Sequence, residues 1–292
     1  GTLAGASTLG LLIPPSIIMI VYGVSAEVSI SQLFIAGVLP GILLAALFSG
    51  YIMLWALRHP EQVPAADVRM TFMQKLSESR SLIPVVLLIA AVLGSIYTGF
   101  ATATEAAAVG VVGSLVLSAV QGSMTWGTFK DSLMGATRLY CMIALILAGA
   151  AFLTLAMGYI GLPRHLAEWI ASLGLNQAQL IVALAVFYII LGCFLDGISM
   201  VVLTMGVLMP TVQAAGIDPI WFGIFIVLVV EMAQITPPVG FNLFVLQGMT
   251  GRQLPWIAKV AMPMFFLMCG AVALIYVFPG IVTWLPQQMS AR

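Results

Sequence analysis

Long apolar segments separated by short polar ones run the length of the chain, and two of these segments are interrupted by a pair of prolines. The interruptions lie within Gly10–Ser16 and Gln234–Asn242. Proline lacks a backbone N–H and its ring clashes with the preceding turn, so two in succession break a regular helix. At membrane depth such a break is tolerated only where protein or a water-filled cavity surrounds the freed main-chain groups. The pattern predicts two broken helices, at about 8–24 and 219–249, each able to build a small ion or solute site.

The broken helices share a spacing. Pro14, Pro15 and the later Pro40 stand 223 positions before Pro237, Pro238 and Pro263 (237 − 14, 238 − 15 and 263 − 40). Proline-interrupted segments at corresponding positions of two halves point to the binding site of a secondary transporter built from repeats. We therefore expect residues 1–57 to end a first repeat and residues 82–292 to contain the second.

Further apolar runs predict unbroken spans at about 33–57, 82–97, 104–120, 133–157 and 256–279. The polar stretch 58–81 is predicted to be a cytoplasmic linker with a short amphipathic helix, and 163–173 to be an amphipathic helix along the membrane interface. Thr102 and Glu105 have the spacing of a capping box at a helix start. Glu105 is therefore expected to act either as this cap or as an ion ligand.

The apolar stretch at about 178–215 is too long for one helix across a hydrocarbon core of roughly 30 Å. Asp196-Gly197 in its middle is turn chemistry, which favours a re-entrant hairpin with its tip at Asp196–Ser199. Two plain crossings joined by a very short turn are the alternative.

Charge distribution separates these alternatives. With the linker in the cytoplasm and a hairpin at 178–215, all but Arg164 and Arg292 of the 10 Lys and Arg residues fall on the cytoplasmic side. Two full crossings would also move Arg252 and Lys259 outside and weaken the positive-inside pattern. The hairpin arrangement makes the two broken helices run in opposite directions, so the repeats are predicted to be inverted.

Composition sets the class of protein. Hydrophobic residues make up 62% of the chain and charged residues 7%, against about 25% charged in soluble domains. We therefore expect an all-α polytopic membrane protein. Zero net charge without a basic stripe argues against nucleic acid as a partner. The three cysteines are solitary and no Cys-x-x-Cys motif occurs, so we expect them to be packing residues without a disulfide framework. No cofactor is expected. Residue 1 is Gly and no signal peptide is visible, so we expect an N-terminal part to be missing.

Five ordered blocks resemble the large membrane subunit of tripartite ATP-independent periplasmic (TRAP) transporters, of the dicarboxylate-permease M type. The blocks, which cover essentially the whole chain, are Gly10–Ser16 (GLLIPPS), Leu33–Gly41 (LFIAGVLPG), Thr102–Ala108 (TATEAAA), Asp218–Gly223 (DPIWFG) and Ile235–Val245 (ITPPVGFNLFV). The resemblance implies sodium-driven import of organic-acid anions, such as C4-dicarboxylates or sialic acid, across the bacterial inner membrane. It also implies an elevator mechanism, a small membrane subunit and a periplasmic substrate-binding protein as partners, and a first hairpin preceding Gly1. Ala233-Gln234 departs from the family's pattern, which leaves the role of Gln234 open.

Broken helices offer free carbonyls, and their C-terminal ends favour a cation such as Na⁺. For the second repeat the expected sodium and substrate ligands are Thr236, Gly240 and Asn242, with Asp196, Gly197 and Ser199 at the hairpin tip. For the first repeat they are Ser7, Thr8, Gly10 and Ser16. As an alternative, the hydroxyl and amide side chains among these residues form local hydrogen bonds with the backbone of their own helices. The alternative role of Asp196 is to form the turn. Glu231 is a further candidate because a carboxylate at membrane depth needs a partner or water, and it serves either the ion site or a neighbouring helix.

Three other functions are alternatives to a subunit of a TRAP transporter. A stand-alone sodium:anion symporter of related architecture is the closest alternative. An intramembrane hydrolase needs a nucleophile with a base, paired aspartates or a metal set, and only Asp196 and Glu231 are available, in dissimilar contexts. A purely structural subunit would have no reason for two broken helices. A transporter subunit, not an enzyme, is therefore the prediction.

Overall fold

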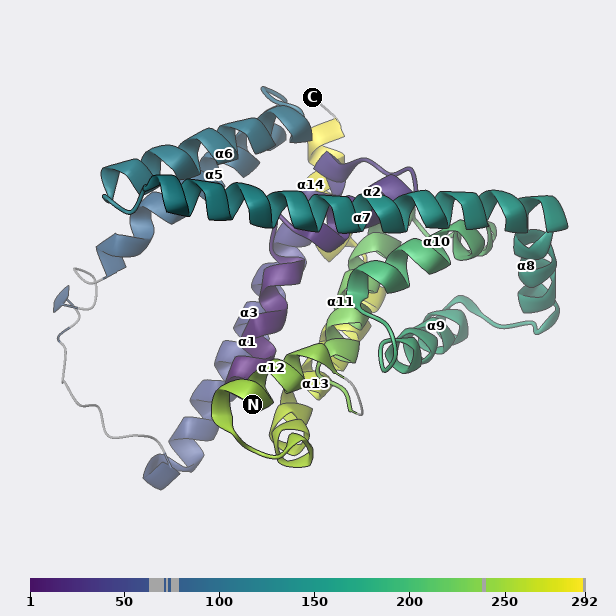
Figure 1. Cartoon of the computed structure of the whole chain (residues 1–292). Helices are drawn as coiled ribbons and strands as arrows, with labels where there is room; N and C mark the ends of the chain where they lie inside the picture. Colours follow the sequence, from purple (N-terminus) through teal and green to yellow (C-terminus); the bar gives the residue numbers. More distant parts are fainter. Residues whose placement is uncertain (63–70, 72, 75–78, 238–239, 291–292) are drawn as a thin grey trace. The chain divides into compact units, whose positions relative to one another are not determined.

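The structure is a computed structural model that describes residues 1–62, 71, 73–74, 79–237 and 240–290. In these ranges every regular element is a helix, as Figure 1 shows. Among the described residues, five helices are long and apolar enough to cross a membrane, and up to six spans result if a bent pair of helices is counted as one. The predicted all-α, polytopic class is confirmed.

The helices, in chain order, are α1 (Thr2–Leu12), α2 (Ile17–Ser25), α3 (Ile30–Arg58), η1 (Pro60–Gln62), η2 (Ser79–Leu82), α5 (Ile83–Tyr97), α6 (Ala103–Val120), α7 (Trp126–Ile160), α8 (Leu162–Ser172), α9 (Gln177–Leu191), α10 (Gly197–Ala214), α11 (Pro219–Gln234), α12 (Phe241–Thr250), α13 (Leu254–Val277) and α14 (Gly280–Ser290). η1 and η2 are single 3₁₀ turns.

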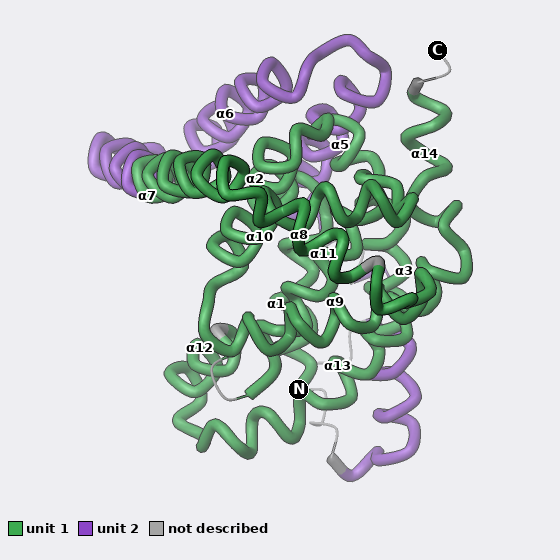
Figure 2. The backbone as a smooth tube through the Cα atoms, turned by 90° about the vertical axis from the view of Figure 1, so that its right-hand side faces the viewer, with its two compact units in different colours: residues 1–48, 139–292 green, residues 49–138 purple. Residues whose placement is uncertain are grey.

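The chain forms two compact units, coloured separately in Figure 2: residues 1–48 with 139–292, and residues 49–138. These units are defined by which residues contact one another. The predicted repeats are defined by symmetry, so the units do not test them. The repeats at 1–57 and 82–292, with the linker 58–81 between them, stay a prediction. Most of the amphipathic helix expected in that linker lies outside the described residues.

In the second unit, α5 and α6 pack against each other. The capping box at the start of α6 is confirmed: the Thr102 N–H donates to Glu105 Oε2 at 2.8 Å, and the Glu105 N–H donates to Thr102 Oγ1 at 3.3 Å. The reciprocal pair satisfies two backbone donors that the first turn of α6 would otherwise leave open.

Helix α11 forms the centre of the first unit. Every residue from Trp221 to Ala233 is buried, and α1, α2, α9, α10, α12, α13 and α14 all contact this helix. A helix that is hydrophobic on all sides is surrounded either by lipid or by other protein elements, and for α11 the surroundings are other helices. The apolar run before the second proline pair therefore forms the core of this unit.

The two broken helices run in opposite directions, as predicted. The Tyr22 hydroxyl near the end of α2 donates to the Pro219 carbonyl at the start of α11, at 2.6 Å. At the other end, α12 packs against α1. Figure 1 shows the same arrangement, with α1 leading to α2 and α11 leading back to α12. The inverted repeat itself stays a prediction.

The 178–215 segment consists of α9 and α10, joined by the turn segment Gly192–Asp196. Tyr188 and Thr204, equidistant from Asp196 in the sequence, share a hydrogen bond between their hydroxyl groups. The two arms therefore contact each other on either side of the predicted tip. Re-entry from one side of the membrane stays a prediction.

Two elements differ from expectation. Helix α7 extends beyond the predicted 133–157 at both ends. At its N-terminal end, Lys130 and Asp131 interrupt the apolar run without breaking the helix. Helix α14 was not predicted, because its hydrophobicity is low and Pro286 lies within it.

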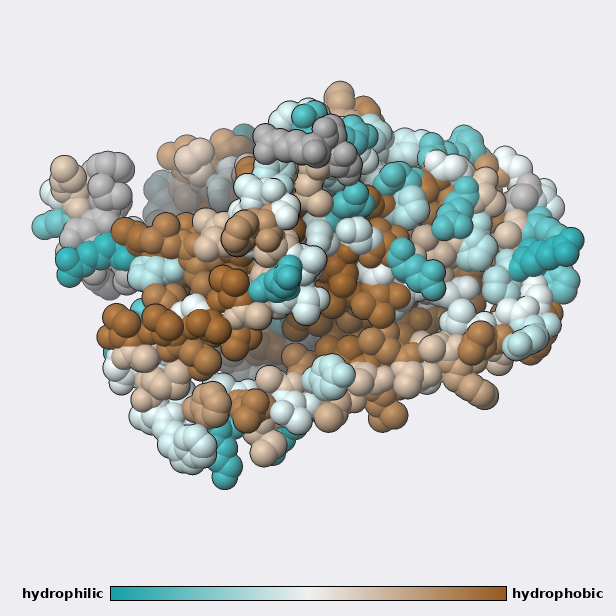
Figure 3. All heavy atoms as spheres, turned by 90° about the horizontal axis from the view of Figure 1, so that it is seen from above, coloured by the Kyte–Doolittle hydropathy of each residue, from teal (hydrophilic) through white to brown (hydrophobic). Residues whose placement is uncertain are grey.

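Apolar side chains occupy much of the surface visible in Figure 3, and the hydrophilic residues gather in separate patches. This surface is what a multi-pass membrane protein requires.

Candidate functional site

The first break has the predicted position. Helix α1 ends at Leu12, α2 begins at Ile17, and the two axes differ by 44°. Ser16 begins α2 as its N-cap, since its hydroxyl oxygen accepts a hydrogen bond from the Met19 N–H at 3.4 Å. The proline pair therefore ends one helix, and the following serine starts the next at a new angle.

The second break lies between Gln234, the last residue of α11, and Phe241, the first of α12. Pro237 is exposed, and Pro238 lies outside the described residues. A Cβ added to Gly240 would meet the Gln234 carbonyl oxygen at 2.5 Å and the Thr236 carbonyl oxygen at 2.9 Å. Two main-chain oxygens at the electronegative C-terminal end of α11 thus approach the same glycine.

The turn segment and the start of α10 each lie against α11 through a glycine. A Cβ on Gly192 would lie 2.2 Å from the Ala233 Cβ, and one on Gly197 would lie 2.6 Å from Val230 Cγ1 and 3.0 Å from Ile18 Cδ1. Only residues without side chains allow this approach. Asp196 caps α10 by accepting from the backbone N–H groups of Ile198 and Ser199, at 3.1 and 3.2 Å.

Cys193 links the same turn segment to the second break. Its buried Sγ lies 3.4 Å from the Ile189 carbonyl oxygen and 3.6 Å from the Pro237 carbonyl oxygen, and these two acceptors share the single thiol proton. The turn segment therefore contacts the main chain of the second break directly.

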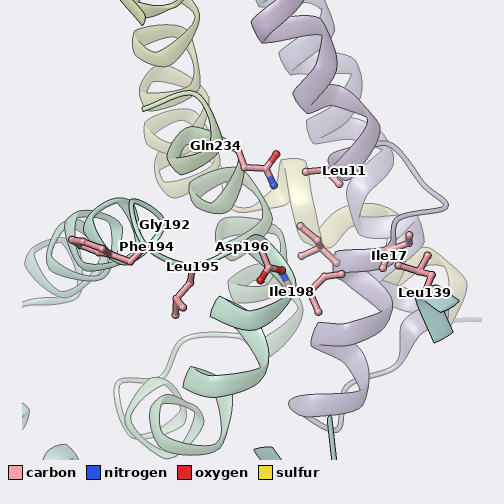
Figure 4. Close-up of a pocket in the computed structure, with 11 residues that line it drawn as sticks. Leu11, Ile17, Leu139, Gly192, Phe194, Leu195, Asp196, Ile198 and Gln234 are labelled. Atoms are coloured by element: carbon pink, nitrogen blue, oxygen red, sulfur yellow. The ribbon is translucent and has the colours of Figure 1, made fainter. Parts of the chain in front are cut away.

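A cavity of about 470 Å³ opens where the first break, the turn segment and the end of α11 meet. It is lined by Leu11, Ile17, Ile18, Leu139, Gly192, Phe194, Leu195, Asp196, Gly197, Ile198 and Gln234. In Figure 4, Gln234 and Asp196 point toward the same space from α11 and the start of α10, with Leu11 and Ile17 on the facing side. Asp196 is the one ionisable group in this lining, and the Gln234 amide is its other polar side chain.

The predicted ligands are distributed unevenly around this cavity. Asp196 and Gly197 line it, and Ser199 donates its hydroxyl proton to Asp196. Asn242 lies at the second break with its amide Nδ2 buried and without a hydrogen-bond partner among the described residues. Part of the predicted second-repeat set therefore lies at the cavity, and part in the break beside it.

The predicted hydroxyl ligands make local hydrogen bonds. Ser7 donates to the Ala4 carbonyl at 2.9 Å, Thr8 to the Gly5 carbonyl at 2.8 Å, and Thr236 to the Met232 carbonyl at 2.6 Å. These are the capping interactions that the sequence left as alternatives. A hydroxyl that donates its proton keeps lone pairs that can still bind an ion, so the ligand roles stay predictions. Gly10 is exposed and has no neighbouring group within 4 Å of an added Cβ.

Two further polar residues stand out. Glu231 is 0% exposed, and neither of its carboxylate oxygens has a hydrogen-bond partner among the described residues. Gln234, whose role the sequence left open, lines the cavity. The signal available in the sequence was a polar side chain at the last turn of a helix that is apolar apart from Glu231. Within the described ranges, no group of three or more His, Cys, Asp or Glu residues is arranged to hold a metal ion.

The chain was compared with known proteins. Residues 1–281 match the family model described as the DctM component of the tripartite ATP-independent periplasmic transporter. Over 99% of its length the chain is 32% identical to a C4-dicarboxylate TRAP transporter large permease protein of Pseudomonas aeruginosa, of which it covers 67%. It is 34% identical to an ectoine/5-hydroxyectoine TRAP transporter large permease protein of Ruegeria pomeroyi. The aligned region covers 97% of this chain and 66% of that protein. An isethionate TRAP transporter permease protein of Oleidesulfovibrio alaskensis is 30% identical, over 95% of this chain and 44% of that protein.

These relatives are transporter permeases, not enzymes. The match extends over both broken helices, the turn segment and nearly all the remaining helices. The chain is a multi-pass membrane protein that belongs to the family of DctM components, the large permeases of TRAP transporters.

Proposed function

We propose that the chain is the large permease subunit of a sodium-coupled importer of organic-acid anions. The observation that carries the proposal is the cavity at which the first break, the turn segment and the end of α11 converge. A packed apolar unit has no structural need for three interrupted elements at one place, since each interruption leaves main-chain groups without helical partners. Interrupted helices near the middle of the membrane are how secondary transporters form ion and substrate sites.

For the coupling ion, the proposed site is the C-terminal end of α11. The Gln234 and Thr236 carbonyl oxygens approach Gly240 there, and half-helix C-terminal ends favour Na⁺. Thr236 and Asn242 supply further polar atoms in the same break. Ser7, Thr8 and Ser16 form the corresponding proposal at the first break.

For the substrate, the proposed site is the cavity itself. Its volume of about 470 Å³ lies within the range of small-molecule sites. The lining contains no Lys, Arg or His, so hydrogen-bond donors such as the Gln234 amide would hold an anionic group. Relatives are named for transport of C4-dicarboxylate, sialic acid and ectoine, which defines the class of small organic acids.

The proposed context is the bacterial inner membrane, with a small membrane subunit and a periplasmic binding protein as partners and an elevator movement of the site. The isethionate relative is named DctMQ, which indicates that two permease components occur in one chain there. A partner membrane subunit is therefore part of the proposal for this chain.

The test is uptake of radiolabelled organic acids into proteoliposomes that contain the assembled transporter, with and without a sodium gradient and the binding protein. We expect uptake to need both. Uptake that needs sodium but not the binding protein would instead support a stand-alone symporter, and uptake without either would refute the proposal.

Variants locate the site. Asp196→Asn, Thr236→Ala and Asn242→Ala are each expected to lower sodium-dependent uptake at least tenfold, and Asp131→Asn on the exposed part of α7 serves as the matched control. Unchanged sodium coupling in all three variants would exclude the proposed ion site.

A further inference from the structure

A second hollow, separate from the cavity above, lies on the outer face of α13. It has a volume of about 520 Å³ and is lined by Pro237, Leu254, Pro255, Ala258, Lys259 and Met262. Four of these residues, at positions 255, 258, 259 and 262, share one face of the helix because they are spaced three and four apart. The opposite face of α13, with Ile257, Ala261 and Met264, is buried in the core. We call this hollow the α13 groove.

Two cations without acidic partners among the described residues lie along the start of α13, one of them in the α13 groove itself. Lys259 is part of its lining, and the Arg252 guanidinium lies 5.2 Å from the ring centroid of Trp256. The sequence contains no Asp or Glu after Glu231, and the one ion pair among the described residues is Arg164–Glu168. Both positive charges are exposed and therefore available to an external anion.

The start of α13 adds to this positive character. Gln253 precedes the helix without forming a side-chain cap, so the positive end of the helix dipole stays open beside the two cations. Trp256 is 52% exposed, and tryptophan at the end of a span lies at the level of lipid headgroups. In the topology predicted from the distribution of Lys and Arg, which counts Arg252 and Lys259 as cytoplasmic, this end of α13 lies on the cytoplasmic side.

We propose that the α13 groove binds an anionic phospholipid of the cytoplasmic leaflet. The acyl chain occupies the apolar floor from Leu254 to Met262, and the phosphate is held by Lys259 and Arg252. The two cations favour an anionic lipid over a neutral one. The apolar hollow beside them favours a lipid over a soluble anion. Because Pro237 forms one wall, the bound lipid contacts the second break and stabilises its position against α13.

The test measures lipid retention by native mass spectrometry on the purified permease in neutral detergent, with phosphatidylglycerol and phosphatidylcholine offered at equal concentration. We expect the wild type to retain phosphatidylglycerol preferentially. The Arg252→Gln/Lys259→Gln variant should bind it about 30-fold more weakly, as two surface cations predict. Lys130→Gln/Arg138→Gln, which removes two cations from α7, is the matched control and should leave retention unchanged.

A second variant tests the apolar floor. Met262→Trp fills the groove at an exposed position without changing charge, so it should also reduce retention of phosphatidylglycerol. Equal retention of both lipids by the wild type, or unchanged retention in the Arg252→Gln/Lys259→Gln variant, would overturn the proposal. Full displacement of the lipid by inorganic phosphate would show a site for free anions instead and would overturn it as well.

Discussion

The contact between Gly192 and Ala233 gives the sharpest stability prediction. A Cβ on Gly192 would lie 2.2 Å from the Ala233 Cβ, whereas two carbon atoms normally approach to about 3.5–4.0 Å. Gly192→Ala therefore forces the turn segment and α11 apart by about 1.3 Å or more. The backbone at Gly192 has φ −70° and ψ −8°, a helical conformation that alanine adopts freely, so the whole penalty is steric.

The expected cost follows from measured overpacking. An extra methyl group in a well-packed core costs about 1–3 kcal/mol, which lowers the melting temperature by about 2–10 °C. Gly149→Ala is the matched control, because nothing lies within 4 Å of an added Cβ there. An alanine in that exposed helical position is expected to be neutral or stabilising by up to about 1 kcal/mol.

A reciprocal substitution isolates the contact. Ala233→Gly alone should destabilise by about 1 kcal/mol because glycine is a poor helix former. Combined with Gly192→Ala it removes the clashing methyl group, so the double variant should be more stable than the sum of the single effects by about 0.5–3 kcal/mol. Thermal unfolding in detergent, followed by tryptophan fluorescence, measures all four proteins. Additive effects, or a Gly192→Ala variant as stable as the wild type, would refute the close approach of the turn segment to α11.

Two further predictions use the same unfolding assay. Tyr22→Phe removes the hydroxyl that donates to the Pro219 carbonyl at 2.6 Å, so a loss of about 0.5–1.5 kcal/mol is expected; a wild-type melting temperature would show that this bond does not join α2 to α11. Glu231→Gln keeps the shape of a side chain whose carboxylate oxygens have no partner in the described structure, so a change below about 1 kcal/mol is expected. A large loss of stability in Glu231→Gln would instead reveal an ionic partner.

Local chemistry made the interruptions predictable. Pro14 and Pro15 end α1 and Ser16 caps α2 through interactions within a few residues. The predicted turn at Asp196 is also local, and there Asp196 caps α10. Such features depend on the chain's own backbone. Sequence patterns therefore located both breaks and the turn between α9 and α10 within a few residues.

The composition of the cavity lining was less predictable. Leu11 and Gln234 are far apart in the sequence, and their place in one cavity depends on how α1, α10 and α11 pack. Polarity drew attention to Thr236 and Ser7, whose hydroxyl groups make local hydrogen bonds. The apolar residues that form most of the lining carry no sign in the sequence that separates them from residues facing lipid.

The reactivity of the Cys193 thiol can measure whether the turn segment separates from the second break. Cys193 is 9% exposed and contacts the Pro237 carbonyl at 3.6 Å, so a water-soluble maleimide reaches it only when the turn segment separates from the break. In a variant whose other two cysteines are replaced by serine, the rate of alkylation of Cys193 measures how often the turn segment separates from the break. Alkylation of Cys193 during uptake would therefore show whether this contact opens in the transport cycle.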